Sequence, residues 1–192
     1  MKVFCLGLSR TGTSSLHAAS LILRIPAIHY PIELAHRWFA GDFSLSATEP
    51  YQLISDLPTP LYFEEFDSSH PGARFILTYR RADQWLDSVE RHFRATAASS
   101  TKTVPRDLIR LACYGTTVFH RQRMLSVYQR HLDRVSRYFA SRPADLLTID
   151  IDEEKSPWTI LCKFSSCRFL KFLFLIYESR SPGPLGDANP KS

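Results

Sequence analysis

Short apolar runs alternate along the chain with stretches whose apolar residues recur at helical spacing. At the N-terminus the run KVFCLGL is rich in strand-forming residues. In the next stretch, TSSLHAASLILRI, three apolar residues fall on one helical stripe: Leu16, Ala19 and Leu23. We therefore expect a strand over residues 2–6, a glycine-containing turn, and a helix that begins near Thr13.

The same alternation continues to about residue 150. Further strands are predicted in IPAIHYP, YQLISDLP, ARFILTYR and RPADLLTIDI, of which Arg74–Tyr79 is the clearest. Helices are predicted in ELAHRWFA, in RADQWLDSVERHF from about Ala82, over residues 121–139 and in SPWTILCKF. A short helix is expected in TPLYFEEFDSSHPG and a polar loop in GDFSLSATEP. Strands that alternate with helices favour an α/β fold in which helices cover both faces of a parallel sheet.

Composition places the chain among globular proteins of one domain. It has 192 residues, of which 44% are apolar and 22% are charged. The four cysteines form no C-x-x-C pair and have no companion His spacing typical of zinc sites. No secretory signal is evident, and the apolar segment Phe169–Tyr177 is much shorter than the roughly 20 residues that span a bilayer. We expect a cytoplasmic protein without a transmembrane span.

Positive charge is concentrated in the middle of the chain. The formal net charge is +5, yet residues 74–142 alone hold thirteen Arg, one Lys and five acidic residues, a balance of +9. Guanidinium groups bind phosphate and sulfate in bidentate fashion, so the excess is compatible with an anionic ligand. Solvated helix faces account for most of these arginines. No aromatic residues interleave with them in a nucleic-acid-binding motif, and we expect no nucleic-acid partner.

The turn after the first predicted strand has the glycine spacing of a phosphate-binding P-loop, G-x-x-x-x-G, at Gly7 and Gly12. Backbone N–H groups of such a turn, together with the dipole of the following helix, favour an anion. Thr13 stands where a nucleotide-triphosphate loop has its lysine, and the nearest cation is Arg10. The missing lysine tells against an ATPase or GTPase. The nearest candidate magnesium ligand, Asp150, is better explained as a strand-end acid, so we expect no metal.

Two segments resemble the signatures of sulfotransferases that use 3′-phosphoadenosine-5′-phosphosulfate (PAPS). GLSRTGTSSL is similar to their 5′-phosphosulfate loop, whose K-[SGT]-G-T core corresponds here to residues 10–13, with Arg10 in place of the usual Lys. FILTYRRADQWLDSVERHF is similar to their second signature, a buried strand that ends in Arg before a helix carrying Ser eight positions later. In this chain those residues are Arg80 and Ser88, which the resemblance assigns to the 3′-phosphate.

The resemblance implies a P-loop-like three-layer fold with a parallel sheet flanked by helices, and it extends over residues 1–164. It assigns the following residues to the PAPS donor: Ser9, Arg10, Thr11, Gly12, Thr13, Ser14, Ser15, Arg80 and Ser88. Shorter segments such as HYP, SDLP and LLTIDI match a group of small sulfotransferase-like proteins that begin at the loop. Residues 165–192 depart from that group, without the basic loop that longer members place over the donor. We expect an atypical, partly disordered tail there.

The resemblance also implies transfer of a sulfuryl group to a hydroxyl or amine of a small-molecule acceptor. Such a transfer requires stabilisation of charge on the leaving phosphate, which suits Arg10, and a base for the acceptor. By position, Asp56 in SDLP matches the family's base, although an Asp in this place is equally typical of a turn. His29, at the end of the second predicted strand, is the alternative base, and the pair Glu64–Glu65 ranks third.

Two other functional classes stay open at the level of the sequence. A catalytically inactive nucleotide-binding module would keep the fold but lose the base or the loop that closes over the donor. An atypical nucleotide kinase or other nucleoside triphosphatase would share the loop and an arginine-rich lid, but it should retain the lysine that Thr13 replaces. The two paired signatures, rather than the charge, favour the sulfotransferase.

Overall fold

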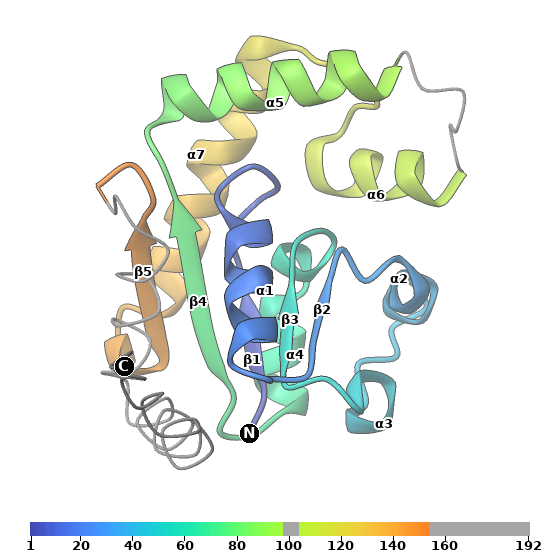
Figure 1. Cartoon of the computed structure of the whole chain (residues 1–192), viewed down its shortest axis with the longest axis vertical. Helices are drawn as coiled ribbons and strands as arrows, with labels where there is room; N and C mark the ends of the chain where they lie inside the picture. The colour runs from blue at the N-terminus through green and yellow to red at the C-terminus, as the bar shows by residue number, and fades with distance from the viewer. Residues whose placement is uncertain (98–103, 154–192) are drawn as a thin grey trace, which may run out of the picture.

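A parallel sheet lies at the centre of the computed structural model, which describes residues 1–97 and 104–153 (Figure 1). Within these residues the sheet has five strands in the order β2-β3-β1-β4-β5. The strands are β1 (Val3–Cys5), β2 (Ala27–His29), β3 (Leu53–Ser55), β4 (Arg74–Tyr79) and β5 (Leu146–Asp150). Neighbouring strands are parallel in every pairing, so their carboxyl ends lie along the same edge of the sheet.

The centre of the sheet is β1, and its position confirms the sequence prediction. Phe4 pairs with Ile54 of β3 on one side and with Phe75 of β4 on the other. The predicted strand over residues 2–6 is present with one residue fewer at each end, and β4 has the predicted bounds. A strand with neighbours on both sides and helices on both faces is buried all round, which explains its unbroken apolar sequence.

The helices in the described residues are α1 (Thr13–Ile22), α2 (Ile32–Phe39), α3 (Leu45–Thr48), α4 (Phe63–Ser69), α5 (Ala82–Ala97), α6 (Val104–Tyr114) and α7 (Arg121–Tyr138), with 3₁₀ turns at Thr59–Leu61 and Pro143–Asp145. Both α1 and α5 begin at the residues that the sequence predicted. The sequence prediction was wrong in two places. It gave a loop where α3 forms one turn of helix, and it assigned no helix to the segment that forms α6.

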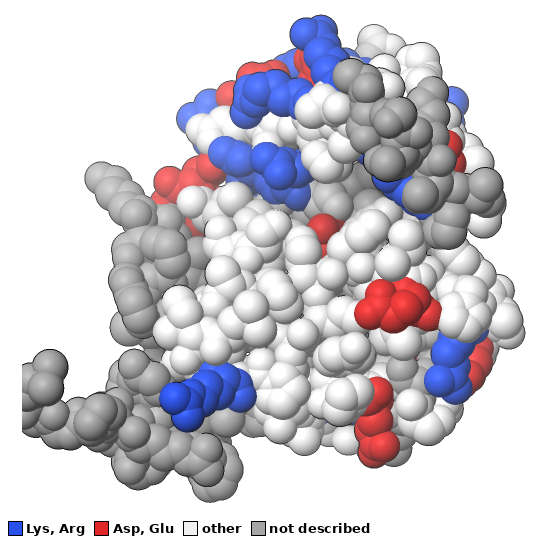
Figure 2. All heavy atoms as spheres, turned by 45° about the vertical axis from the view of Figure 1, so that its right-hand side comes forward, with Lys and Arg blue, Asp and Glu red and all other residues white. Residues whose placement is uncertain are grey.

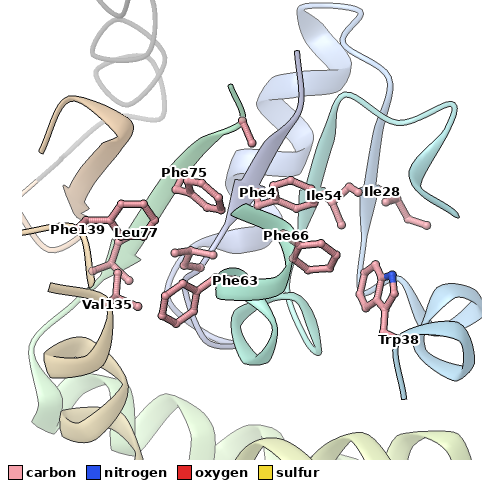
Figure 3. Close-up of a cluster of buried hydrophobic side chains, with 12 residues drawn as sticks. Phe4, Ile28, Trp38, Ile54, Phe63, Phe66, Phe75, Leu77, Val135 and Phe139 are labelled. Atoms are coloured by element: carbon pink, nitrogen blue, oxygen red, sulfur yellow. The ribbon is translucent and has the colours of Figure 1, made fainter. Parts of the chain in front are cut away.

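Helices cover both faces of the sheet, in the predicted three-layer arrangement. On one face, Leu16 of α1 packs with Val3 and Cys5 of β1 and with Ile76 of β4. On the other face, α2, α4 and α7 contribute large side chains to a cluster, most members of which are labelled in Figure 3. There Phe66 of α4 stacks on Phe4 with ring centroids 4.3 Å apart. Alternate residues of each strand thus supply the two halves of the core.

A third cluster lies beyond the carboxyl edge of the sheet and forms the frame of the functional site. It joins Trp85 and Phe93 of α5, Ile109 of α6, and Met124 and Tyr128 of α7, all of them buried. In Figure 1, α5 crosses above the ends of the strands, and α6 lies beside it over the same edge. The apolar stripe predicted for α5 therefore packs against other helices, and the side chains at the edge of that packing face the strand ends.

Some sequence predictions concern residues outside the described ranges. These are the helix in SPWTILCKF, the atypical tail at residues 165–192, and the apolar segment Phe169–Tyr177. Among residues 1–97 and 104–153, none of the helices combines the length and the apolar character that crossing a membrane requires.

Candidate functional site

The loop between β1 and α1 depends on two glycines for different reasons. A Cβ atom on Gly7 would lie 1.9 Å from the Thr78 hydroxyl oxygen and 2.8 Å from the Thr78 carbonyl oxygen, so no larger residue fits against β4. Gly12 has a φ of 89°, a left-handed conformation that favours glycine, directly before the first residue of α1. Arg10 also has a positive φ, 75°. The loop therefore holds a fixed, energetically costly shape in front of a helix N-terminus, as expected for a site that binds an anion.

Thr11 is fully buried beneath this loop. Its hydroxyl donates to the Leu8 carbonyl oxygen at 2.7 Å and lies 2.9 Å from the Thr78 hydroxyl. Among the residues that the sequence assigned to the donor, Thr11 is the one whose side chain does not line the adjoining cavity. Its hydroxyl fastens the loop to β4.

A cavity of about 550 Å³ lies between the carboxyl edge of the sheet and helices α5 and α6. The other residues assigned to the donor line it, as do both candidate bases, Asp56 and His29. Figure 2 shows a hollow in this region of the surface, with basic side chains above it and an acidic side chain within it. Asp56 is the acidic residue among those that line the cavity, and four arginines line it too. The site is therefore strongly positive.

The two signature segments are in direct contact. The Arg10 Nε group donates a hydrogen bond of 3.1 Å to the hydroxyl oxygen of Ser88, a buried residue on α5. In addition, the indole N–H of Trp85 donates to the Ser9 carbonyl oxygen at 3.0 Å. The loop and the second signature thus form one site rather than two separate ones.

An aromatic pair holds the backbone that follows β4. Trp85 stacks on Tyr128 of α7 with ring centroids 4.3 Å apart. The Tyr128 hydroxyl donates to the Arg80 carbonyl oxygen at 2.7 Å and accepts from the Arg80 backbone N–H at 3.0 Å. Burial raises the pKa of Tyr128 to about 12, so the hydroxyl keeps its proton and can make both contacts at neutral pH. The Arg80 backbone is therefore fixed beside the loop.

The Arg80 side chain is held by polar neighbours at one end only. One terminal nitrogen donates to Gln84 at 2.8 Å and to the Asp152 carboxylate at 3.0 Å, while the second Asp152 oxygen accepts from the Arg81 backbone N–H at 2.7 Å. The Arg80 Nε atom is buried and has no hydrogen-bond partner among the described residues. Asp83, a nearby acid on α5, pairs with the exposed Arg81 at 2.9 Å. Arg80 thus keeps a buried donor for a ligand.

Asp56 and His29, two alternatives at the sequence level, lie next to one another. Asp56 Oδ1 accepts hydrogen bonds from the Ser9 hydroxyl at 2.5 Å and from the Leu57 backbone N–H at 2.8 Å. The other oxygen, Oδ2, is 3.3 Å from His29 Nε2, which also lies 3.2 Å from the Ser14 hydroxyl. The two strand ends that carry these residues, β2 and β3, are paired in register. By contrast, Glu64 lies on α4 and pairs with Arg134, away from the cavity.

The neighbours of the His29 ring fit either tautomer. Its Nδ1 atom is 3.3 Å from the Ser55 hydroxyl, which also donates to the Ile28 carbonyl oxygen at 3.3 Å. A proton on Nδ1 would be donated to Ser55, whereas a proton on Nε2 would be donated to Asp56 Oδ2. The doubly protonated ring would make both contacts.

Helix α6 contributes cavity residues that the sequence prediction missed. Arg106 and Arg110 line the cavity opposite the loop, together with His92 of α5. Burial lowers the pKa of His92, and the charges of Arg10 and Arg110 lower it further. The signal available in the sequence was the spacing of four between the two arginines, which puts them on one face once a helix is recognised.

In the described ranges no group of three or more His, Cys, Asp or Glu residues could hold a metal ion.

Comparison with known proteins identifies the family. A family profile described as a sulfotransferase domain matches residues 2–168. Ava biosynthesis cluster protein M of Aspergillus versicolor is 34% identical over 110 residues, a match that covers 47% of this chain and 42% of that protein. The chain thus matches less than half of the length of this curated relative.

Among solved structures, a gluconokinase from Sinorhizobium meliloti 1021 aligns over 94% of this chain and 97% of its own, with a TM-score of 0.44 and 13% identity. A likeness at that level carries no argument about function. The family profile, in contrast, covers most of the chain and includes both segments that meet at the cavity. The chain belongs to the sulfotransferase domain family.

Proposed function

We propose that this protein transfers a sulfuryl group from PAPS to a hydroxyl or amine of a small-molecule acceptor. One observation carries the proposal: the two signature segments, far apart in the sequence, line one cavity that also holds Asp56 and His29. An acyl- or phosphate-binding loop alone would require neither Arg80 nor a base. A relative named for a biosynthesis cluster is compatible with a small-molecule acceptor.

The residues present fit a donor with anionic groups at both its 5′ and 3′ positions. The loop supplies a helix N-terminus, the Arg10 guanidinium and several hydroxyls for the 5′-phosphosulfate. Arg80 offers its buried, unpartnered Nε group, and Ser88 offers a hydroxyl that already accepts from Arg10. A 3′-phosphate would replace Asp152 as the anion beside Arg80. No group on the cavity wall requires a metal for these contacts.

In this reaction the protein positions the donor and the acceptor and stabilises the negative charge that develops on the leaving phosphate. In the reaction, the acceptor oxygen or nitrogen forms a bond to sulfur while the bond from sulfur to the bridging phosphate oxygen breaks. The leaving product is adenosine 3′,5′-bisphosphate, and the acceptor loses one proton. Arg10 stabilises the negative charge on the leaving oxygen and, because a guanidinium does not give up its proton, acts as a fixed charge.

The acceptor proton goes to the Asp56–His29 pair. In the tautomer that donates its Nδ1 proton to Ser55, His29 accepts the acceptor's proton on Nε2, and Asp56 Oδ2 at 3.3 Å stabilises the imidazolium that results. This arrangement combines the two candidates rather than choosing between them.

Ligand-induced stabilisation tests the proposal without knowledge of the acceptor. Adenosine 3′,5′-bisphosphate at about a hundred times its dissociation constant should add roughly 2.7 kcal/mol to the free energy of unfolding, measured by thermal denaturation. Arg80→Ala should weaken the bisphosphate by about one to two orders of magnitude, because a charge-assisted contact is lost. The same substitution should leave adenosine 5′-phosphate almost unaffected, since that nucleotide has no 3′-phosphate.

Two results would contradict the proposal. Stabilisation by ATP or GTP with magnesium, but not by the bisphosphate, would indicate a nucleoside triphosphatase instead. Equal weakening of both adenine nucleotides by Arg80→Ala would remove Arg80 from the 3′-phosphate. Arg137→Ala is the matched control, because Arg137 is exposed on α7 and bonds only within its own helix among the described residues.

A further inference from the structure

We propose that the acceptor carries a carboxylate on an aromatic or apolar body, and that Arg106 and Arg110 of α6 bind this carboxylate. The inference rests on the proposed function, because it names the class of acceptor that the same cavity would take. It is carried by the placement, burial and missing counter-charges of the two arginines.

The two arginines occupy a part of the cavity that the donor does not use. The donor's anionic groups are accounted for by the loop, Arg10, Arg80 and Ser88, which lie at the ends of β1 and β4 and on the facing side of α5. Arg106 and Arg110 come from α6 and lie four residues apart, so their side chains leave the same face of that helix. Their charges therefore serve a second anion.

Both side chains are short of partners that carry negative charge. Arg110 is only 7% exposed; its guanidinium lies 4.3 Å from the centre of the Phe93 ring and donates to the Thr96 hydroxyl at 2.7 Å. Burial lowers the pKa of Arg110, and the neighbouring charge of Arg106 lowers it further. The Arg106 Nε atom is buried and lacks a hydrogen-bond partner in the described part of the chain. Buried charges without a counter-ion are costly, and a bound carboxylate would remove that cost.

Nearby acids form no ion pair with these arginines. Arg106 and Arg110 also line a second hollow of about 370 Å³, which contains Glu90 and Asp107, and the charge of Asp107 acts to raise the pKa of Arg110. Glu90 pairs with Arg94 and Arg121, and none of the ion pairs between described residues includes Arg106 or Arg110. Within the main cavity, Asp56 is the acid, and it belongs to the proton-accepting pair.

The wall between the two ends of the cavity is largely apolar and aromatic. Val89, Phe93, Tyr114 and Tyr30 line it, and Tyr30 is within electrostatic reach of both Asp56 and Arg110. Burial raises the pKa of the Tyr114 hydroxyl well above its usual value, so this group stays neutral. A molecule with a hydroxyl at Asp56–His29, an aromatic ring along this wall and a carboxylate at α6 would match each part in turn.

Matched acids and amides provide the test. The probes are 4-hydroxybenzoate, 4-hydroxyphenylacetate and 3-(4-hydroxyphenyl)propanoate, each compared with its primary amide, which has almost the same shape but no charge. Binding is measured by thermal unfolding with adenosine 3′,5′-bisphosphate present, and transfer is measured with PAPS. At least one acid should be favoured over its amide by about ten- to a hundredfold, the range expected for a charge-assisted pair.

Substitutions then assign the preference to α6. The ratio of acid to amide should fall towards one in Arg106→Gln and in Arg110→Gln, with Arg137→Gln as the surface control. Arg110→Lys, which keeps the charge, covers the case in which Arg110→Gln fails to fold. In Arg106→Glu the preference should turn towards 4-hydroxyphenethylamine, a result that a purely structural arginine would not produce.

Each contrary result has a separate meaning. Equal binding of acids and amides throughout the series would overturn the inference, and so would an acid preference that persists in both Arg106→Gln and Arg110→Gln. Binding of the bisphosphate without any acid preference would overturn this inference alone. Failure to bind the bisphosphate would overturn the proposed function instead.

Discussion

At the scale of single residues, Asp56 has its two oxygens in different roles. Oδ1 accepts from Ser9 and from its own chain at Leu57, which fixes the carboxylate against the loop. Oδ2 faces His29. Asp56 itself has a φ of 69°, a conformation that costs energy for a residue other than glycine and that clusters at functional sites. The two hydrogen bonds at Oδ1 fix the carboxylate so that Oδ2 stays directed at the imidazole.

Substitution of each partner should separate the roles of the pair. Asp56→Asn keeps an acceptor for Leu57 but removes the charge, so turnover with an accepted acceptor should fall by about 10²-fold or more while the bisphosphate binds normally. His29→Gln should cause a similar fall. Single-turnover transfer from PAPS measures both. An unchanged rate in Asp56→Asn together with an inactive His29→Gln would assign the base to His29 alone.

Asp152 is a potential competitor of the donor, because its carboxylate forms an ion pair with the Arg80 guanidinium. A 3′-phosphate must compete with it. Asp152→Asn should therefore strengthen adenosine 3′,5′-bisphosphate binding by about three- to tenfold, the scale of a partly exposed ion pair, and should leave adenosine 5′-phosphate unchanged. Calorimetric titration of both nucleotides gives the answer. Weaker binding of the bisphosphate would show instead that Asp152 holds Arg80 in its binding position.

At the scale of elements, one histidine joins α7 to the start of the loop. The side chain of His131 is half-buried, and its Nε2–H donates to the Leu6 carbonyl oxygen at 2.7 Å, directly after β1. Burial lowers the pKa of His131 to about 4. The folded state favours the neutral His131 ring. Above the unfolded pKa of about 6.5 the ring is neutral in both states, and the free energy of unfolding is at its full value. As pH falls from there towards 4, the unfolded chain takes up the proton first and this free energy declines.

The consequence can be measured as a pH dependence of stability. Between pH 8 and pH 5 the wild-type protein should lose about 2 kcal/mol of unfolding free energy through His131. His131→Gln keeps a donor for Leu6 but does not titrate, so its loss over the same interval should be smaller by that amount. Urea denaturation at each pH provides the values. Parallel losses in both proteins would mean that His131 does not carry the effect.

The aromatic contact between α5 and α7 shows why the second signature is a packed unit. Trp85 and Tyr128 stack, and through Ser9 and Arg80 they also hold the backbones of both signature segments. The position of Arg80 is thus set by the packing of helices, and not by the strand alone.

At the scale of the whole molecule, the sequence predicted those features that depend on local periodicity. Apolar runs located β1 and β4, and the glycine spacing of Gly7 and Gly12 located the turn between β1 and α1. The order of the strands along the chain then placed Asp56 and His29 at one edge, because parallel strands share their carboxyl ends. The family resemblance, confirmed by the profile match, supplied the donor-binding residues as expectations.

What the sequence did not predict has two different causes. Helix α6 is at least as amphipathic as α5, so the local pattern was present and went unrecognised, and the cavity residues Arg106 and Arg110 were missed with it. Asp152 reaches Arg80 only because β5 pairs with β4 in a particular register, and that contact between distant segments leaves no local pattern.

The central position of β1 also has a consequence for synthesis. Among the five described strands β1 is made before its neighbours, so it can pair only after β3 and β4 have followed it along the chain. Until Arg74–Tyr79 has been made, the apolar segment Val3–Cys5 has an unpaired edge that is open to wrong partners. Gly7 lies against Thr78 of β4, so the loop between β1 and α1 gains its shape only when β4 is in place.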